Sequence, residues 1–137
     1  MGASDVHLKV DRPPAFRCDG TVLPVEDWPP LEAAQLESVL TAVTAHDPTR
    51  AAECRQSGEL DLAYTPPGLP RFRVNGFRQR GAMSFAFRLI PSEIPPFSTL
   101  GLPEGVPLLA EEHRGLILCT GATGSGKSTT LAAIVDT

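Results

Sequence analysis

The run Gly121-Ala122-Thr123-Gly124-Ser125-Gly126-Lys127-Ser128 matches the pattern G-x-x-x-x-G-K-[ST], which restricts the backbone more than any other feature of the chain. Several backbone N–H groups of such a loop point at one centre, and a side chain at a glycine position would hold the backbone away from it. Phosphate oxygens suit this arrangement, with Lys127 reaching the β- and γ-phosphates and the Ser128 hydroxyl ligating Mg²⁺. The sequence therefore predicts a P-loop, or Walker A motif, that binds ATP with Mg²⁺.

The segments on either side of the loop support this prediction. The apolar run 115–120 before it is typical of a parallel strand buried on both faces. Residues 128–135 after it predict a helix, whose dipole and free N–H groups would face an anion at the loop. A glycine-rich turn without a ligand is the alternative, but it does not explain why Lys127 and Ser128 stand at the start of the helix. The predicted nucleotide-binding residues of the loop are Gly121, Ala122, Thr123, Gly124, Ser125, Gly126, Lys127, Ser128 and Thr129, with Ser128 as the metal ligand.

The position of the loop in the chain predicts two domains. A phosphate-binding loop belongs to the first strand–helix unit of its sheet, yet about 115 residues precede it here. We therefore expect a separate domain over 1–91, a proline-containing linker over 92–97 and the beginning of a second domain over 98–137. One strand and one helix cannot bury a core, so the chain is expected to be part of a longer protein.

The first 91 residues predict an α+β domain, with an antiparallel sheet and helices on one face. Alternating apolar positions, together with turn signals such as Asp19-Gly20 and Gly81, predict the strands, and a bulge is expected at Gly76. Apolar residues recurring at helical spacing predict the longer helix. The predicted strands are 6–10, 15–18, 21–23, 59–64, one that begins at 71, and 83–89; the predicted helices are 31–45 and 48–56.

Composition narrows the class of protein. The formal net charge of −4 disfavours non-specific nucleic-acid binding by the whole chain. The three cysteines have neither metal-site nor disulfide spacing, which indicates reduced thiols in a cytosolic protein. We expect no signal peptide and no transmembrane segment, because no suitable apolar run is present.

Five arginines fall within 18 positions of the chain, and three interpretations remain open for them. They can line a solvated strand face, neutralise phosphates of a nucleotide held by a neighbouring domain or subunit, or bind RNA or single-stranded DNA. Two nearby phenylalanines, Phe85 and Phe87, have the spacing of core residues, which disfavours base stacking. The five are Arg71, Arg73, Arg78, Arg80 and Arg88.

The motifs, taken in order, resemble the hexameric secretion and type IV pilus motor ATPases, most closely their twitching-motility, pilus-retraction (PilT-like) branch. The resemblance covers essentially the whole chain, and its combination of motifs is more specific than the loop alone. The matching stretches are Gly2-Ala3-Ser4-Asp5-Val6-His7-Leu8-Lys9, Pro13-Pro14 through Asp19-Gly20, Arg71-Phe72-Arg73-Val74-Asn75, Phe87-Arg88-Leu89-Ile90-Pro91, and Arg114 through Leu131.

This resemblance implies a PAS-like N-terminal domain followed by the start of an α/β RecA-like P-loop ATPase domain. It implies a cytoplasmic homo-hexamer, peripheral at the inner membrane and docked on a pilus platform protein, without nucleic acid as a partner. Arg88 and Arg73 are the implied nucleotide contacts of the N-terminal domain. The metal-positioning Asp of the second nucleotide motif and the catalytic Glu are expected beyond Thr137, so the 137-residue chain alone is expected to be inactive.

The resemblance leaves two alternatives open. A pilus-assembly or type II secretion ATPase has the same motifs in the same order. A non-hydrolysing oligomerisation or partner-binding module is the other alternative, if Thr137 is the true terminus.

Overall fold

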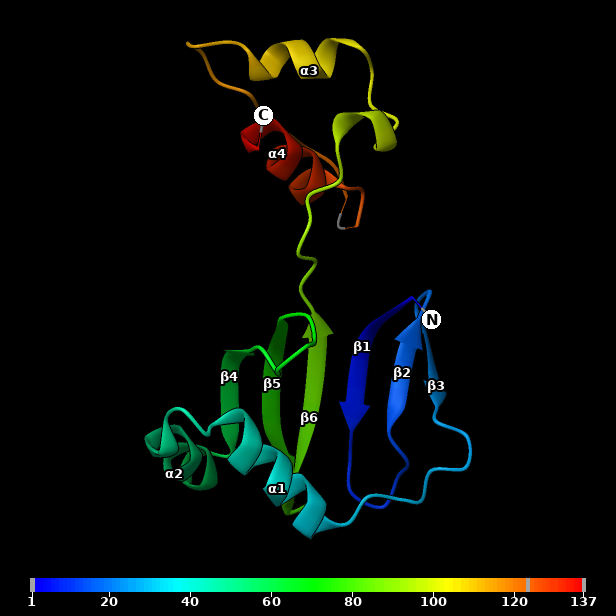
Figure 1. Ribbon diagram of the computed structural model, residues 1–137, viewed down its shortest axis with the longest axis vertical. Coiled ribbons are helices and arrows are strands. Elements are labelled where there is room, and N and C mark those ends of the chain that lie inside the picture. Colours follow the sequence, from blue (N-terminus) through cyan, green and yellow to red (C-terminus); the bar gives the residue numbers. More distant parts are fainter. Residues whose placement is uncertain (1, 123, 137) are drawn as a thin grey trace. The chain divides into compact units, whose positions relative to one another are not determined.

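The computed structural model describes residues 2–122 and 124–136, which form parts of two compact units, Met1–Pro91 and Ser92–Thr137. We call these unit 1 and unit 2 and describe each by itself. Unit 1 is an α+β structure built on one sheet (Figure 1). The described part of unit 2 contains three short helical segments.

The sheet of unit 1 has six strands in the order β3-β2-β1-β6-β5-β4, and every neighbouring pair is antiparallel. The first strand in the chain therefore lies at the centre, between the β2–β3 hairpin and the last strand, β6 (Figure 1). Its strands are β1 (Ala3–Leu8), β2 (Ala15–Cys18), β3 (Thr21–Pro24), β4 (Glu59–Tyr64), β5 (Phe72–Gln79) and β6 (Ala82–Leu89).

Two helices, α1 (Ala33–Val43) and α2 (Pro48–Ser57), pack against the sheet, α1 mainly on β6 and α2 on β4. Their ends follow from local chemistry. Glu32 and Gln35 form a capping box at the start of α1. The Asp47 side chain accepts the Thr49 N–H at the start of α2, and Gly58 ends that helix in the left-handed conformation, φ 80°.

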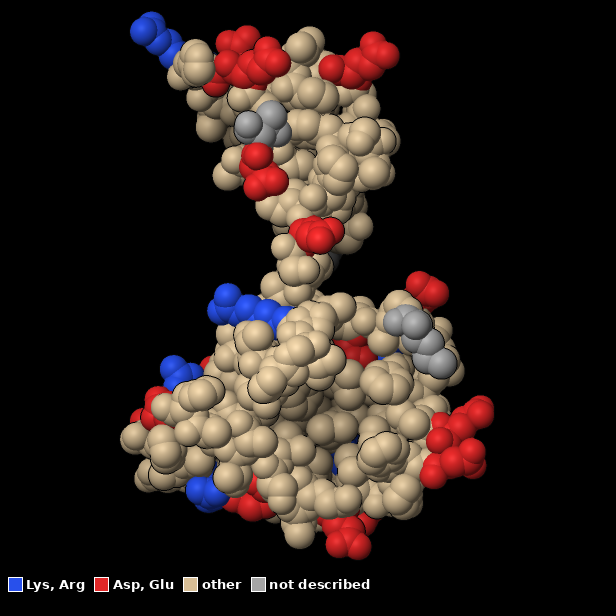
Figure 2. Space-filling model, in the orientation of Figure 1, with Lys and Arg blue, Asp and Glu red and all other residues tan. Residues whose placement is uncertain are grey.

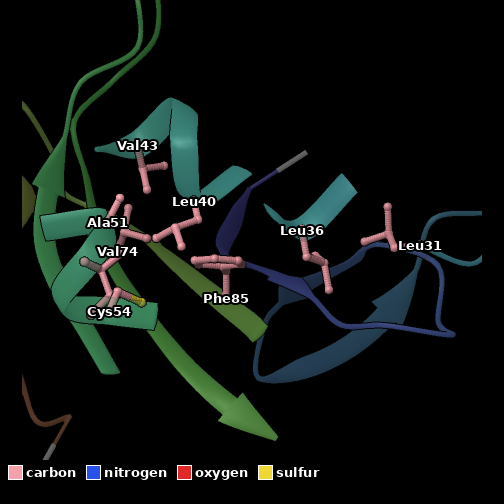
Figure 3. Close-up of a cluster of buried hydrophobic side chains, with 9 residues drawn as sticks. Leu31, Leu36, Leu40, Val43, Ala51, Cys54, Val74 and Phe85 are labelled. Carbon is pink, nitrogen blue, oxygen red and sulfur yellow. The ribbon is translucent and has the colours of Figure 1, made fainter. Parts of the chain in front are cut away.

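The core of unit 1 lies between these helices and one face of the sheet. The Phe85 ring, 1% exposed, sits in the middle of the buried cluster with side chains from α1, α2 and β5 around it (Figure 3). Leu36 and Leu40 contribute from α1, and Val74 contributes from β5. Because strand side chains alternate, the residues on either side of Val74 and Phe85 face away from this core.

Two local predictions in unit 1 are wrong. The first strand covers Ala3–Leu8 rather than 6–10. Gly76 is not a bulge, since its register with Leu60 and Phe85 is continuous, whereas the register of β1 with β2 shifts between Ala3 and Asp5. Close packing explains the glycine instead: a Cβ at Gly76 would lie 3.0 Å from Phe85 Cε1 and 3.1 Å from Leu60 Cβ.

Unit 2 differs from the prediction at its expected strand. Residues 115–120 are not in a strand, and Leu116 and Leu118 are 82% and 76% exposed. A buried parallel strand needs hydrogen-bonded neighbours on both sides, and the described part of unit 2 contains none. The helical segments of unit 2 are η1 (Phe97–Thr99), α3 (Gly105–Ala110) and α4 (Lys127–Val135).

Candidate functional site

The glycine-rich loop has a backbone that other residues would not adopt readily. Gly124 and Gly126 have φ values of 82° and 90°, in the left-handed region where a Cβ is strained. Gly121 has φ 150°, and a Cβ there would lie 2.8 Å from Ser125 Oγ. A side chain at Gly121 would therefore force the Ser125 hydroxyl to move, in addition to the strain of the positive φ.

Lys127 is the first residue of α4, and its side chain folds back over the loop. Its Nζ donates to the carbonyl oxygens of Gly121, at 2.9 Å, and Ala122, at 2.6 Å. The loop thus holds a positive charge close to its own first residues. Phosphate oxygens can replace these neutral acceptors, because a hydrogen bond between two charged groups is about twice as strong.

The N-terminus of α4 adds further donors at the same place. Gly126 is the N-cap, and the Thr130 N–H donates back to the Gly126 carbonyl at 2.9 Å. Helix geometry leaves the N–H groups of Lys127, Ser128 and Thr129 without an acceptor inside the helix. The structure therefore brings the predicted residues of the loop together at a helix start, with Ser128 exposed there; Thr123 lies outside the described residues.

Arg88 and Arg73, the two arginines predicted to contact phosphate, lie directly opposite each other on β6 and β5. They share the sheet face that points away from the core, since Phe87 and Val74 beside them pack into it. Each is held by a carboxylate. Arg88 Nε donates to Asp5 Oδ1 at 2.9 Å, whereas Arg73 uses Nε and Nη2 on the two oxygens of Asp61, at 3.1 and 2.7 Å.

Sequence reasoning missed the carboxylate that organises this face, Asp5. The Asp5 side chain is 7% exposed, and it lies opposite Arg17 on one neighbouring strand and Arg88 on the other. Ser4 Oγ donates to Asp5 Oδ2 at 2.7 Å, and Arg17 Nε lies 3.5 Å from the same oxygen. The order of the strands, with β1 at the centre, is the signal that would have identified it.

Different interactions keep the carboxylates of Asp5 and Asp61 in their charged form. Burial alone raises the pKa of Asp5, but the hydrogen bond from Ser4, the hydrogen bond and charge of Arg88, and the charge of Arg17 together lower that pKa below its ordinary value. For Asp61 the hydrogen bonds from Arg73 are the main cause of a lowered pKa. Both carboxylates are therefore ionised at neutral pH.

In the described ranges 2–122 and 124–136, no helix is both long and apolar enough to cross a membrane. Over those same ranges, no cluster of three His, Cys, Asp or Glu side chains is arranged to hold a metal ion.

Comparison with known proteins identifies the class. The family model described as type II/IV secretion system protein matches residues 1–137. The chain belongs to this family, whose relatives include ATPases.

The relatives include a protein named for type IV pilus retraction. The chain is 42% identical to the type IV pilus retraction ATPase PilT of Pseudomonas aeruginosa, over 99% of this chain and 39% of the relative. Its structure is similar to a crystal structure of the pilus retraction motor PilT with bound ADP, with a TM-score of 0.86 and 41% identity over 99% of this chain and 39% of that one. The ATPase DotB of Legionella pneumophila gives a TM-score of 0.77 at 29% identity, over 97% of this chain and 37% of DotB. The chain thus spans about two fifths of the length of these relatives.

Proposed function

We propose that this chain is the ATP-binding N-terminal part of a motor ATPase that couples ATP hydrolysis to type IV pilus retraction. In this proposal unit 1 corresponds to the PAS-like domain and unit 2 to the start of the RecA-like ATPase domain. The observation that carries the proposal is the glycine-rich loop, with the Lys127 ammonium over its first residues and the free N–H groups of α4 at its end.

The residues present fit ATP with Mg²⁺. The φ values of Gly124 and Gly126, 82° and 90°, let the backbone turn without side chains at these positions, so that backbone N–H groups can approach the phosphates. Lys127 and the first N–H groups of α4 bind the phosphates, and the exposed Ser128 hydroxyl is the metal ligand. When bound, ATP supplies the phosphoanhydride bond whose cleavage drives the motor.

Arg88 is a better phosphate contact than Arg73 in this proposal. Asp61 accepts hydrogen bonds from two nitrogens of Arg73, Nε and Nη2, which leaves only one terminal nitrogen of that guanidinium without this partner. Asp5 engages only Nε of Arg88, whose side chain is 73% exposed. The terminal nitrogens of Arg88 can therefore donate to a phosphate held by a neighbouring domain or subunit.

The protein that we propose acts in the cytoplasm as a homo-hexamer, docked on a pilus platform protein at the inner membrane. The family relationship and the retraction function in the name of PilT support this assignment. Binding of nucleic acid is disfavoured, since the formal net charge is −4 and acidic groups predominate on the face of the described residues that Figure 2 shows.

ATP turnover in the longer protein tests the proposal. We expect Lys127→Ala to lower turnover by at least about 100-fold, and Arg88→Ala by about 10- to 1,000-fold, because a guanidinium stabilises the charge that develops on the transferred phosphoryl group. Arg12→Ala, which removes an exposed arginine on the loop after β1, is the matched control and should have no effect. Wild-type turnover in Lys127→Ala would contradict the assignment of the loop, and wild-type turnover in Arg88→Ala that of the arginine.

A further inference from the structure

We propose that Asp5 is a positioning residue, which holds the Arg88 side chain in the orientation in which it reaches nucleotide phosphate. This inference rests on the proposed role of Arg88. It adds a residue that contacts no nucleotide itself and acts through the arginine.

The place of Asp5 in the sheet makes it suitable for this role. β1 is hydrogen-bonded to β2 on one side and to β6 on the other, so Asp5 lies directly between Arg17 and Arg88. The next residue along this row is Arg73, opposite Arg88. One buried carboxylate thus lies between arginines of its two neighbouring strands, β2 and β6, with Arg73 one strand further on.

The carboxylate of Asp5 is fixed through both of its oxygens. Oδ1 accepts from Arg88 Nε at 2.9 Å, and Oδ2 accepts from Ser4 Oγ at 2.7 Å, with Arg17 Nε 3.5 Å away. Because the Asp5 side chain is only 7% exposed, water cannot easily take the place of these donors. A hydrogen bond to such a carboxylate sets the direction of the Arg88 side chain.

The contact leaves the functional end of Arg88 available. Nε is the nitrogen nearest the backbone, and the two terminal nitrogens lie beyond it. Within residues 2–122 and 124–136, Asp5 is the one acceptor that Arg88 contacts through its side chain. The pairing thus orients the guanidinium without occupying the nitrogens that would bind a phosphate.

Asp5 also offsets an unfavourable neighbour. Two arginines directly opposite on adjacent strands repel each other, and Arg88 and Arg73 are such a pair. Each has its own carboxylate on the side away from the other, Asp5 for Arg88 and Asp61 for Arg73. Without Asp5, repulsion from Arg73 and Arg17 would favour other orientations of the Arg88 side chain.

The first measurement uses the nucleotide-free 137-residue chain. A nitrogen-15 spectrum of the arginine side chains should show the Arg88 Nε–H with slowed exchange, because it is bonded to a buried carboxylate. We expect Asp5→Asn to remove this signal and Asp61→Asn, the matched control, to leave it in place. An unchanged Arg88 signal in Asp5→Asn would overturn the inference before any nucleotide is added.

The second measurement is ATP turnover in the longer protein. We expect Asp5→Asn to lower kcat/KM by about 10- to 100-fold, the loss typical when the group that orients a binding side chain is removed. Asp61→Asn should change kcat/KM by less than about threefold. Since Asp5 acts through Arg88, the Asp5→Asn/Arg88→Ala double variant should be no worse than Arg88→Ala.

The outcomes separate this inference from the proposed function. Wild-type kcat/KM in Asp5→Asn, or losses that add in the double variant, would overturn the role of Asp5 while leaving Arg88 as a phosphate contact. Wild-type kcat/KM in Arg88→Ala would overturn both. If Asp5→Asn does not fold, Ser4→Ala removes the hydrogen bond to Oδ2 from an exposed residue. An Arg88 signal and a kcat/KM that both stay unchanged in Ser4→Ala would then contradict the inference.

Discussion

Unit 1 and unit 2 differ in how they bury apolar side chains. Among residues 2–91 of unit 1, nine buried core residues link α1, α2 and the sheet in one cluster. In the described part of unit 2, Ala133 is the one buried hydrophobic residue, while Leu116 and Leu118 are largely exposed. Unit 1 therefore has a core of its own, whereas the apolar run before the loop in unit 2 lacks one.

The difference between the two units shows which structural features are determined by residues close together in the sequence. The loop takes its form from glycines with positive φ and from the helix that starts at Lys127, within about ten residues of sequence. A parallel strand depends on neighbours distant in sequence, and the run 115–120 lacks them here. The proposed phosphate site thus needs less of the chain than the sheet that would support it.

The largest expected difference between the units is in core truncation. Phe85→Ala should lower the free energy of unfolding of unit 1 by about 3–5 kcal/mol, because it empties the middle of the buried cluster. Leu116→Ala, in unit 2, should change the free energy of unfolding of the chain by less than about 0.5 kcal/mol, since the Leu116 side chain is 82% exposed. Urea denaturation followed by circular dichroism measures both, and equal losses would contradict the comparison.

A smaller contrast is expected between two glycines. Gly76→Ala should destabilise unit 1 by about 1–3 kcal/mol, because the new Cβ meets Phe85 and Leu60 at 3.0–3.1 Å. Gly105→Ala, at the start of α3, meets nothing within 4 Å and should be neutral. Thermal unfolding of the two variants gives the comparison; a neutral Gly76→Ala would mean that the sheet relaxes more than its packing indicates.

The free energy of unfolding at acid pH should test the contribution of Asp5 to the stability of unit 1. The pKa of Asp5 is lowered in the folded state, so its contribution is present above the unfolded pKa, about 3.9, and is lost as the pH falls through the folded value. Asp5→Asn should be less stable than wild type at pH 6, and the gap should narrow towards pH 2.5. Urea midpoints across this range test the sign, and a gap that widens in acid would contradict it.

The smallest effect is expected at the exposed pair Asp61–Arg73. Its side chains are 50% and 67% exposed, so solvent and salt screen the attraction. Asp61→Asn should lower the melting temperature less than Asp5→Asn does, and 0.5 M NaCl should reduce the small difference further. A loss larger than that of Asp5→Asn would show that burial does not rank the two carboxylates.

The sequence predicted much of unit 1, because alternation, helical spacing and turn residues are local signals. Leu36 and Leu40 form the buried face of α1, and Phe85 and Phe87, predicted from their spacing to be core residues, lie in or against the core cluster. The importance of Asp5 could not be read in this way, because it depends on the pairing of β1 with β6, 83 residues apart at the Asp5–Arg88 contact.

The same distinction between local and distant signals applies to the proposed phosphate site. Glycine spacing predicted a loop whose positive φ values at Gly124 and Gly126 are found in the structure. The strand predicted before it is wrong, because a pattern of apolar residues cannot supply the neighbouring strands. Whether the loop binds nucleotide stays a prediction of the sequence and the family.

The central claim is that the loop from Gly121 to Thr129 holds nucleotide phosphates. Its most direct test is to titrate the 137-residue chain with Mg·ATP and follow the backbone N–H signals by nuclear magnetic resonance. The account predicts saturable shifts concentrated at Gly124, Gly126, Lys127, Ser128 and Thr129, lost in Lys127→Ala but kept in Arg12→Ala. Unshifted loop signals at millimolar Mg·ATP, or equal shifts in Lys127→Ala, would contradict it.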